Sequence, residues 1–288
     1  MKVLITGGQN GQLRSELLRS CPAQFQILES GSDHRLDVTD PQAVESLFAD
    51  AAPELIINAA AYTAVDKAET EQELAFAVNE QGVVNLATAA ASHGSHLIHV
   101  STDFVFEQGS GAPFQVSDSR VPANVYGRSK LAGEHYLEQH YAKHSLIVRT
   151  AWVYSAFGNN FVKTMLRLMA ERDELGVIAD QIGSPTWARG LAHALWVAAD
   201  QRATGVMHWT GAGVASWYDF AQAIMEEAVE LGLLQRPVNV IPLRTDQYPT
   251  PAARPHYSVL ETTGTRESLQ LPAIHWRVEL RDMLREMV

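Results

Sequence analysis

Tyr126 and Lys130 are the two residues whose types and spacing could do chemistry. They stand four apart in the stretch VYGRSK, which the helix-forming run LAGE follows. In a helix, residues four apart project from one face a turn apart, so the phenol and the ammonium would be neighbours. A cation within roughly 4 to 6 Å lowers the pKa of a phenol toward the range of a useful proton donor. Because the same spacing occurs on ordinary surface helices, this interpretation depends on the motifs upstream.

A glycine-rich turn near the N-terminus predicts a phosphate-binding site. A short apolar strand, 2–5, runs into TGGQNGQL and then into a helix that ends near Ser20. Gly8 and Gly11 permit a tight turn and close approach of a pyrophosphate, which would rest on the free N–H groups of the helix N-terminus. Arg14 stands where a third glycine is usual. Either the helix stands off the strand, or Arg14 points outward and covers the cofactor's phosphates.

An acidic residue follows at the spacing expected for a contact with ribose. Glu29 ends the second predicted strand, 26–29, and an acid there favours NADH over NADPH through repulsion of the 2′-phosphate. His34 and Arg35 could offset that repulsion, so both cofactors stay open.

Strands and helices alternate six times before residue 150, which predicts a Rossmann-like, doubly wound parallel sheet. Small and hydroxyl side chains follow the ends of two strands, in Asn58 to Ala61 and in Ser101 to Asp103, where such a sheet binds its ligands. The strands expected here are 2–5, 26–29, 36–38, 54–58, 96–103 and 145–149, with helices over 40–50 and 71–91 and from about 125.

The alternation loosens after Trp152, and we expect a smaller C-terminal α/β lobe that closes one side of the ligand crevice. The chain is accordingly divided into a dinucleotide-binding Rossmann domain, 1–150, and a mainly substrate-binding lobe, 151–288, with some segments returning to the Rossmann core. The expected helices are 161–171, 189–200, 216–231 and 278–287, and the expected strands are 175–179, 206–209 and 239–242.

Composition limits the partners of the protein. The chain has 288 residues and a formal net charge of −11 at pH 7, which argues against nucleic acid or an anionic membrane as the main partner. The apolar run after Met1 is too short for a signal peptide, and no segment has the length and apolarity of a membrane span. The single cysteine, Cys21, fits a reducing compartment, so we expect a cytoplasmic protein.

Taken together, the motifs resemble the extended short-chain dehydrogenase/reductase family. Finer matches over nearly the whole chain are similar to its branch that reduces 4-keto deoxysugars carried on dTDP. These matches are NAAAYTAVDKAE (58–69), STDFVF (101–106), VYGRSKLAGE (125–134), RTAWVY (149–154), GNNF (158–161) and YPTPAARP (248–255). Two departures are Arg14, in place of the third glycine, and Phe104, where a tyrosine is common.

The resemblance implies a role for each matching residue. Catalysis is implied for Thr102, Tyr126 and Lys130. Gly8, Gly11, Gln12 and Leu13 would hold the pyrophosphate, Asp37 and Val38 the adenine side, and Ala61, Tyr62 and Thr63 the nicotinamide half, with Tyr126 and Lys130 also touching the cofactor. The sugar would be bound by Thr102, Asp103 and Trp152, and Tyr248 and Arg254 are candidates for the nucleotide diphosphate.

The implied reaction is reduction of the C4 keto group of dTDP-6-deoxy-L-lyxo-4-hexulose to dTDP-L-rhamnose with NADPH or NADH. Thr102 would polarise the carbonyl, Tyr126 would give it a proton, and Lys130 would lower the pKa of Tyr126. Two alternatives stay open. One is another nucleotide-deoxysugar 4-ketoreductase, and the other is a non-catalytic NADP-binding regulatory subunit similar to the β subunit of methionine adenosyltransferase.

Metal binding has weak support in the sequence. His93, His96 and His99 do not converge, because His96 and His99 fall on opposite faces of a predicted strand. The acidic group of Glu226, Glu227 and Glu230 reads as an exposed helix surface. We leave open a Mg²⁺ ion at a subunit contact, together with a homodimer.

Overall fold

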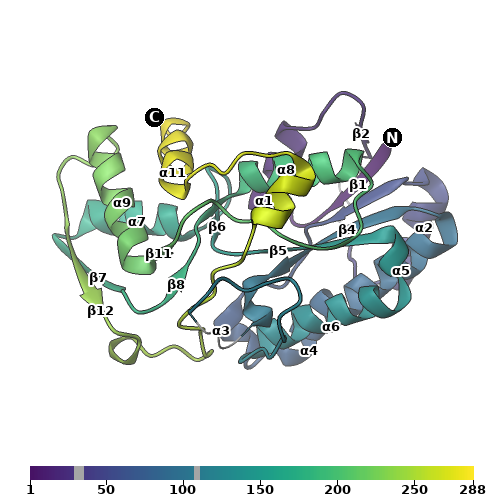
Figure 1. The fold of residues 1–288 in the computed structure, drawn as a ribbon, viewed down its shortest axis with the longest axis horizontal. Helices are drawn as coiled ribbons and strands as arrows, with labels where there is room; N and C mark the ends of the chain where they lie inside the picture. Colours follow the sequence, from purple (N-terminus) through teal and green to yellow (C-terminus); the bar gives the residue numbers. More distant parts are fainter. Residues whose placement is uncertain (29–35, 107–110) are drawn as a thin grey trace.

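A six-stranded parallel sheet forms the centre of the larger lobe, here called the Rossmann lobe (Figure 1). The protein is represented by a computed structural model that describes residues 1–28, 36–106 and 111–288. The strand order is β10-β5-β4-β3-β1-β2, with all neighbours parallel. The strands are β1 (Lys2–Thr6), β2 (Gln26–Ile27), β3 (Leu55–Asn58), β4 (His96–Thr102), β5 (Ser145–Thr150) and β10 (Gly205–His208).

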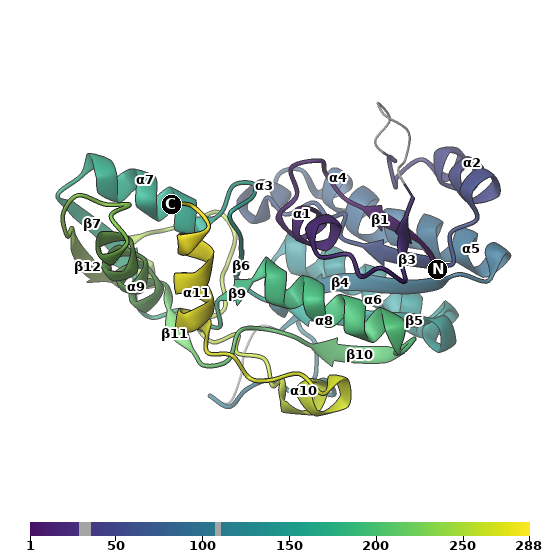
Figure 2. The same cartoon turned by 90° about the horizontal axis from the view of Figure 1, so that it is seen from above.

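Helices cover both faces of this sheet, which confirms the doubly wound α/β fold. On one face, α1 (Gln12–Arg19) and α8 (Ala188–Asp200) pack their apolar sides on β1, β3 and β5. On the other, α2 (Pro41–Ala51), α5 (Gly82–His93) and α6 (Val125–His140) do the same (Figure 2). Buried on both faces, β1, β3 and β5 each carry three consecutive apolar residues rather than an alternating pattern.

Helix α6 lies very close to its neighbours because glycines face them. A Cβ atom on Gly127 would overlap the carbonyl oxygen of Phe104, and one on Gly133 would overlap that of Asn79. Asn79 lies in a π-helical turn (Ala77–Gln81) that joins α4 (Gln72–Phe76) to α5. The short helix α3 (Val65–Ala68) precedes α4.

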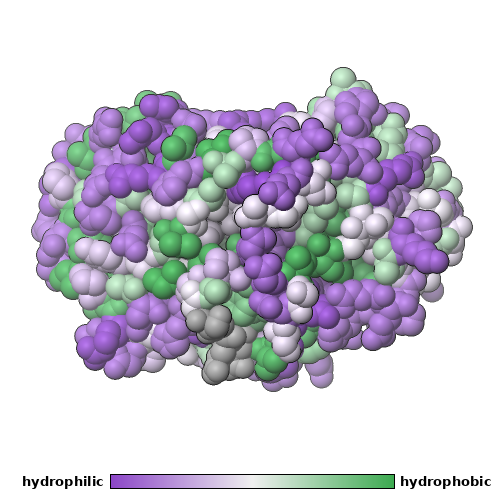
Figure 3. All heavy atoms as spheres, in the orientation of Figure 1, coloured by the Kyte–Doolittle hydropathy of each residue, from purple (hydrophilic) through white to green (hydrophobic). Residues whose placement is uncertain are grey.

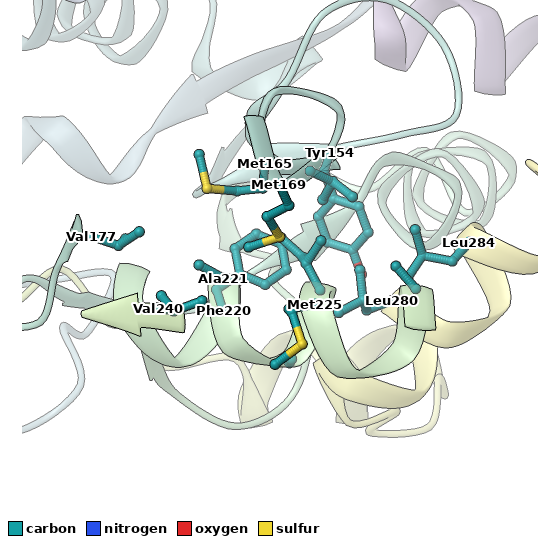
Figure 4. Packing of buried hydrophobic residues seen from close by; sticks show 14 of the residues in the cluster. Tyr154, Met165, Met169, Val177, Phe220, Ala221, Met225, Val240, Leu280 and Leu284 are labelled. Atoms are coloured by element: carbon teal, nitrogen blue, oxygen red, sulfur yellow. The ribbon is translucent and has the colours of Figure 1, made fainter. Parts of the chain in front are cut away.

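The remaining elements form a smaller lobe, here called the small lobe, beside the sheet (Figure 2). Its core gathers aromatic and methionine side chains around Phe220 (Figure 4). Ser216 begins its central helix with a capping box completed by Asp219. Its elements are β6 (Val153–Tyr154), α7 (Phe161–Glu171), β7 (Glu174–Ile178), β8 (Ile182–Gly183), β9 (Thr186–Trp187), β11 (Ala215–Ser216), α9 (Trp217–Glu230), β12 (Asn239–Leu243) and α11 (Trp276–Arg285).

One predicted strand is wrong. Residues 36–38 form no strand, because the Asp37 carboxylate accepts hydrogen bonds from the backbone N–H and the hydroxyl of Thr39 and starts a turn. The sixth place in the sheet is taken instead by β10, which pairs with β5 from far along the chain. Helix α10 (Thr263–Leu269) also packs on the Rossmann lobe through Leu269. The predicted helix over 71–91 is interrupted by the π turn.

The surface carries mostly hydrophilic side chains on the face drawn in Figure 3, with apolar ones in small groups. Across residues 1–28, 36–106 and 111–288, no helix combines the length and the apolarity that a membrane crossing requires.

Candidate active site

A cavity of about 340 Å³ opens at the carboxyl edge of the sheet. It lies where β1, β3, β4 and β5 end, since residues just after β1 and β3 and residues at the ends of β4 and β5 line it. In a doubly wound sheet this edge is where ligands bind. The lining residues are Gly7, Gly8, Asn10, Gly11, Gln12, Leu13, Arg14, Ala59, Ala61, Thr63, Val100, Ser101, Tyr126, Lys130, Thr150, Val153, Asn159 and Leu191.

The glycine turn has the shape of an anion site. Gly7 has a φ of 119°, and a Cβ on it would lie 3.2 Å from the carbonyl oxygen of Ala59. The N–H of Gly11 donates to the carbonyl of Gly8 at 2.8 Å, and among the described residues no heavy atom outside its two chain neighbours lies within 4 Å of the Cβ position of Gly8. Helix α1 starts at Gln12 without a side-chain cap, so its first N–H groups stay available for an anion.

A loop from the start of the small lobe covers this turn. Asn160 donates to the side-chain oxygen of Gln12 at 3.0 Å, and a Cβ on Gly158 would lie 2.8 Å from the carbonyl oxygen of Asn10. Arg14 lines the cavity, which favours the second of the two interpretations left open for it, a guanidinium over the cofactor's phosphates.

The start of α6 is fixed by two side chains. The Asn124 side-chain oxygen accepts from the N–H of Gly127 at 2.8 Å, and the Glu69 carboxylate accepts from the N–H of Val125 at the same distance. Capping of this kind satisfies backbone donors that would otherwise lack a partner. Tyr126 and Lys130 then follow in the first turns of the helix, and both line the cavity.

The pKa of Tyr126 differs from the sequence prediction. Burial raises the pKa of its phenol to about 12, while the neighbouring Thr102 hydroxyl opposes the rise and the charge of Asp103 adds to it. Lys130 does not lower this pKa, because its ammonium is turned to the carbonyl oxygen of Val100 at 2.7 Å. Among the protein's own groups, burial therefore keeps the phenol protonated at neutral pH.

Lys130 is itself buried, with 1% of its surface exposed. Burial lowers its pKa to about 8, so the side chain is still mainly a cation at neutral pH. Its nitrogen also lies 3.3 Å from Nε2 of His99, a residue that sequence reasoning considered only as a metal ligand.

Thr102 and Asp103 lie at the end of β4. The Thr102 hydroxyl donates to Asp103 Oδ1 at 3.0 Å and accepts from the N–H of Phe104 at 3.2 Å. Burial raises the pKa of Asp103 to about 6, and hydrogen bonds from Ser258 and Thr102 oppose that rise. Ser258 was not predicted, and it brings the C-terminal segment to this end of the site.

Asn79 fixes the segment that lines the pocket after β3. Its side chain accepts from the N–H of Tyr62 at 2.9 Å and donates to the carbonyl of Tyr62 and to the hydroxyl of Ser129, both at 3.0 Å. Sequence reasoning noted Asn79 only as a residue within a helix. An asparagine on the helix face that carries Ala75 and Val83, four residues before and four after it, was the signal available.

Several predicted cofactor residues do not line the cavity. Asp37 is exposed in its turn, and Val38 is buried against α5. Tyr62 holds its place through the backbone while its hydroxyl donates to Glu71 at 2.5 Å. Glu29 lies outside the described residues.

The predicted substrate residues of the C-terminal half make protein contacts. Trp152 has a φ of 48° and stacks on Trp217, with ring centroids 3.6 Å apart. Arg254 forms a two-pronged ion pair with Asp66 at 2.9 and 3.0 Å, and Tyr248 is exposed.

The acidic residues considered for Mg²⁺ do not fit a cation. Arg277 binds both Glu226 and Glu227, and Arg281 also binds Glu227, so these carboxylates already have positive partners. Over the described part of the chain, no group of three or more His, Cys, Asp or Glu side chains could hold a metal ion.

A doubly wound sheet whose carboxyl edge joins a glycine turn to a buried tyrosine and lysine defines a short-chain dehydrogenase/reductase fold. The model of the RmlD substrate binding domain family matches residues 1–288, the whole chain. The chain therefore belongs to this family, and it is an oxidoreductase.

Individual relatives agree with this assignment. The chain is 42% identical to dTDP-4-dehydrorhamnose reductase of Escherichia coli K12 over 297 aligned positions, covering 100% of this chain and 98% of the relative. The crystal structure of a dTDP-4-dehydrorhamnose reductase from Clostridium acetobutylicum is 38% identical, with a TM-score of 0.92 over 100% of this chain and 99% of the other. The enzyme from Bacillus anthracis, solved in complex with NADP, is 35% identical, with a TM-score of 0.90 over 99% of each chain.

Proposed function

We propose that the protein reduces the C4 keto group of dTDP-6-deoxy-L-lyxo-4-hexulose to dTDP-L-rhamnose with NADPH or NADH. One observation carries the proposal: a single cavity is lined both by the glycine turn and by Tyr126 and Lys130. A dinucleotide on the turn would thus extend toward the acid–base pair. The full-length similarity to dTDP-4-dehydrorhamnose reductases supports the choice of sugar.

The residues around the glycine turn fit a dinucleotide. Gly8, Gly11 and the first N–H groups of α1 would take the pyrophosphate, with Arg14 adding a positive charge. Ala61 and Thr63 would flank the nicotinamide half, and the complex of the Bacillus anthracis relative with NADP supports a phosphate-bearing cofactor. The adenine contacts of Asp37 and Val38 stay predictions.

The reacting carbonyl would lie between Thr102 and Tyr126. Thr102 would donate a hydrogen bond to the carbonyl oxygen, and Tyr126 would give that oxygen a proton. The pKa of Tyr126, which burial raises to about 12, keeps the proton on the phenol until the oxygen gains charge. Lys130 would hold the ribose hydroxyls with those ammonium protons that the Val100 carbonyl leaves free. When bound, the cofactor supplies the hydride that reduces C4.

Tyr126→Phe tests this assignment. We expect the variant to bind the reduced cofactor as the wild type does and to lose about 10²- to 10⁴-fold in kcat, since only the proton donor is removed. The measurement is the fall in nicotinamide absorbance with the dTDP-4-keto sugar, together with analysis of the product. Tyr136→Phe is the matched control, because Tyr136 lies on the same helix and outside the cavity lining.

Other results with the wild-type protein in the same assay would indicate a competing function. Cofactor binding without oxidation of the sugar would indicate the non-catalytic regulatory subunit. Oxidation with a product other than dTDP-L-rhamnose would indicate another nucleotide-deoxysugar 4-ketoreductase. A cytoplasmic location and a homodimer belong to the same proposal, and fractionation of cells and the mass of the native protein in solution test them.

A further inference from the structure

A chain of buried polar side chains runs behind the pocket from β1 to α6. Thr6, Asn58 and His99 come from three neighbouring strands, and Lys130 ends the chain at the pocket. All four side chains are buried. The Thr6 hydroxyl lies 2.6 Å from Asn58 Oδ1, Asn58 Nδ2 lies 3.0 Å from His99 Nδ1, and His99 Nε2 lies 3.3 Å from Lys130 Nζ.

The backbone fixes the direction of the Asn58 amide. The N–H of Ala60 donates to Asn58 Oδ1 at 3.1 Å, and a backbone N–H can only donate. The same N–H lies 3.3 Å from the Thr6 hydroxyl, and turning the amide would place its NH₂ group against this donor, so we take the oxygen to face Ala60 and Thr6 and the NH₂ group to face His99. As a result, Nδ1 of His99 accepts a hydrogen bond and carries no proton.

A neutral imidazole that accepts at Nδ1 carries its proton on Nε2. That proton points at Lys130, whose ammonium has three N–H donors and no acceptor. We propose that His99 is a positioning residue for Lys130: held by Asn58 as the Nε2–H tautomer, it accepts none of the ammonium's protons and so leaves them for Val100 and for a ligand in the pocket. The role in turnover rests on the function proposed above.

The charges around this contact agree with the geometry. Burial, with the nearby Lys130 charge, lowers the pKa of His99 well below its ordinary value, so the ring is neutral at pH 7. Tyr126 and Glu134 lie one turn from Lys130 on the same helix, and among the described residues the charge of Glu134 favours the ammonium. An N–H dipole aimed at the ammonium acts in the opposite direction, because it favours the neutral amine.

The tautomer of His99 can be observed directly. Long-range proton–nitrogen correlation spectra of protein labelled with ¹⁵N-histidine distinguish the two neutral tautomers and the imidazolium, and His99→Gln assigns the signal by its loss. We expect the Nε2–H form between pH 6 and 8. An Nδ1–H form or an imidazolium at pH 7 would overturn the proposal. Because the wild-type spectrum is decisive, a variant that folds poorly removes only the assignment, which a second substitution, His99→Asn, can supply.

Asn58→Asp should reverse the direction of the hydrogen bond between residue 58 and His99 Nδ1. The carboxylate still accepts from Ala60 and Thr6, but it also accepts from His99, which turns the ring to its Nδ1–H form and leaves Nε2 to accept from Lys130. We expect the alkaline limb of the kcat profile to move up by about one pH unit, since a hydrogen bond to the charged form and a nearby negative charge both raise the pKa of Lys130. A switched tautomer with an unmoved alkaline limb would refute the positioning role.

His96→Gln is the matched control. His96 is a buried histidine on the same strand, and its Nε2 binds the carbonyl oxygen of Ala203 away from the pocket. Its substitution should leave the alkaline limb in place. The spectra require neither cofactor nor sugar. Absence of turnover beside the Nε2–H spectrum would therefore count against the proposed function alone, whereas the wrong tautomer would count against the inference alone.

Discussion

The interiors of the two lobes are stabilised by different kinds of interaction. Behind the pocket, the Rossmann lobe buries charge: Lys130, Glu134 and Arg149 are each no more than 1% exposed. The core of the small lobe is built from aromatic, methionine and aliphatic side chains (Figure 4). It also buries the carboxylate of Glu227, but the partners of that carboxylate, Arg277 and Arg281, are 42% and 41% exposed. An ion pair buried on both sides, Glu134 with Arg149, is thus found in the lobe that carries the acid–base residues.

This contrast indicates what each lobe contributes. A buried ion pair needs good geometry to offset desolvation, so it adds little net stability but tolerates few alternative arrangements. Glu134 accepts from Arg149 of β5 and from Arg120, and Arg149 also contacts His208 of β10. The pair therefore ties α6, with its tyrosine and lysine, to two strands of the sheet. Apolar packing, as in the small lobe, stabilises without fixing side chains so narrowly.

Breaking the buried pair should give the largest effect. Arg149→Met leaves the Glu134 carboxylate without its main partner in a dry environment, and we expect a loss of about 3–5 kcal/mol in the free energy of unfolding. Urea unfolding followed by circular dichroism measures it. Arg285→Met, which removes an exposed pair with Asp282 in the small lobe, should change stability little. Equal costs for the two variants would contradict the contrast between the lobes.

A cavity in the small lobe should come next. Met283 of α11 is fully buried in that lobe's core, and Met283→Ala should cost about 3 kcal/mol through lost burial and an unfilled cavity. Because the side chain lies outside the pocket, kcat per folded molecule should not change. A large fall in kcat with the fold intact would mean that packing in the small lobe also sets the geometry of the acid–base residues.

The sequence predicts the Rossmann lobe well because its signals are local. The strand-to-helix glycine turn around Gly8 and the long apolar strands are properties of a few adjacent residues. The strand over 36–38 is wrong because Asp37 starts a local turn, whereas the strand 206–209 was predicted and only its place in the sheet, as β10, was not. Which segment fills the edge of a sheet is decided by pairing across the chain, here between β5 and residues 205–208, and no local pattern records it.

The residues of the candidate site also divide into those that a local pattern predicts and those that depend on distant parts of the chain. Tyr126 and Lys130 follow from helical spacing, and the structure places both at the pocket. The contacts of His99, Asn79 and Ser258 each involve a residue at least 17 positions away in the chain. The predicted effect of Lys130 on Tyr126 fails for a related reason. Spacing gives proximity, whereas the sign of the pKa shift depends on burial and on where the ammonium points.

Glu279 lies at the boundary between the lobes, where α11 of the small lobe meets α8 of the Rossmann lobe. Its carboxylate lies against Gly190 of α8 and Gly211, and Oε2 finds no hydrogen-bond partner among the described residues. Burial raises its pKa to about 7. Since the folded pKa exceeds the ordinary value of 4.5, this group's contribution to stability is fully present below pH 4.5 and is lost as the pH rises through 7.

Glu279→Gln removes that titration. We expect the free energy of unfolding of the variant to increase relative to that of the wild type as the pH rises from 5 to 8. At pH 8 the difference should be roughly 2 kcal/mol. Urea unfolding at several pH values measures the difference. A constant offset between the two proteins at every pH would show that this carboxyl titrates in the folded state as it does in the unfolded chain.

The smallest expected effect concerns the pair that joins the segment 248–255 to α3. Arg254→Met and Asp66→Asn each break the same partly exposed ion pair, so each should cost less than about 1 kcal/mol, and less in high salt. The two variants also separate the pairing seen here from the diphosphate contact considered for Arg254. If pairing is the role of the guanidinium, both variants change the KM for the dTDP-sugar equally. A KM that rises steeply for Arg254→Met and not for Asp66→Asn would instead assign the guanidinium to the diphosphate. In that case the small lobe would contribute a charge to binding as well as an apolar core.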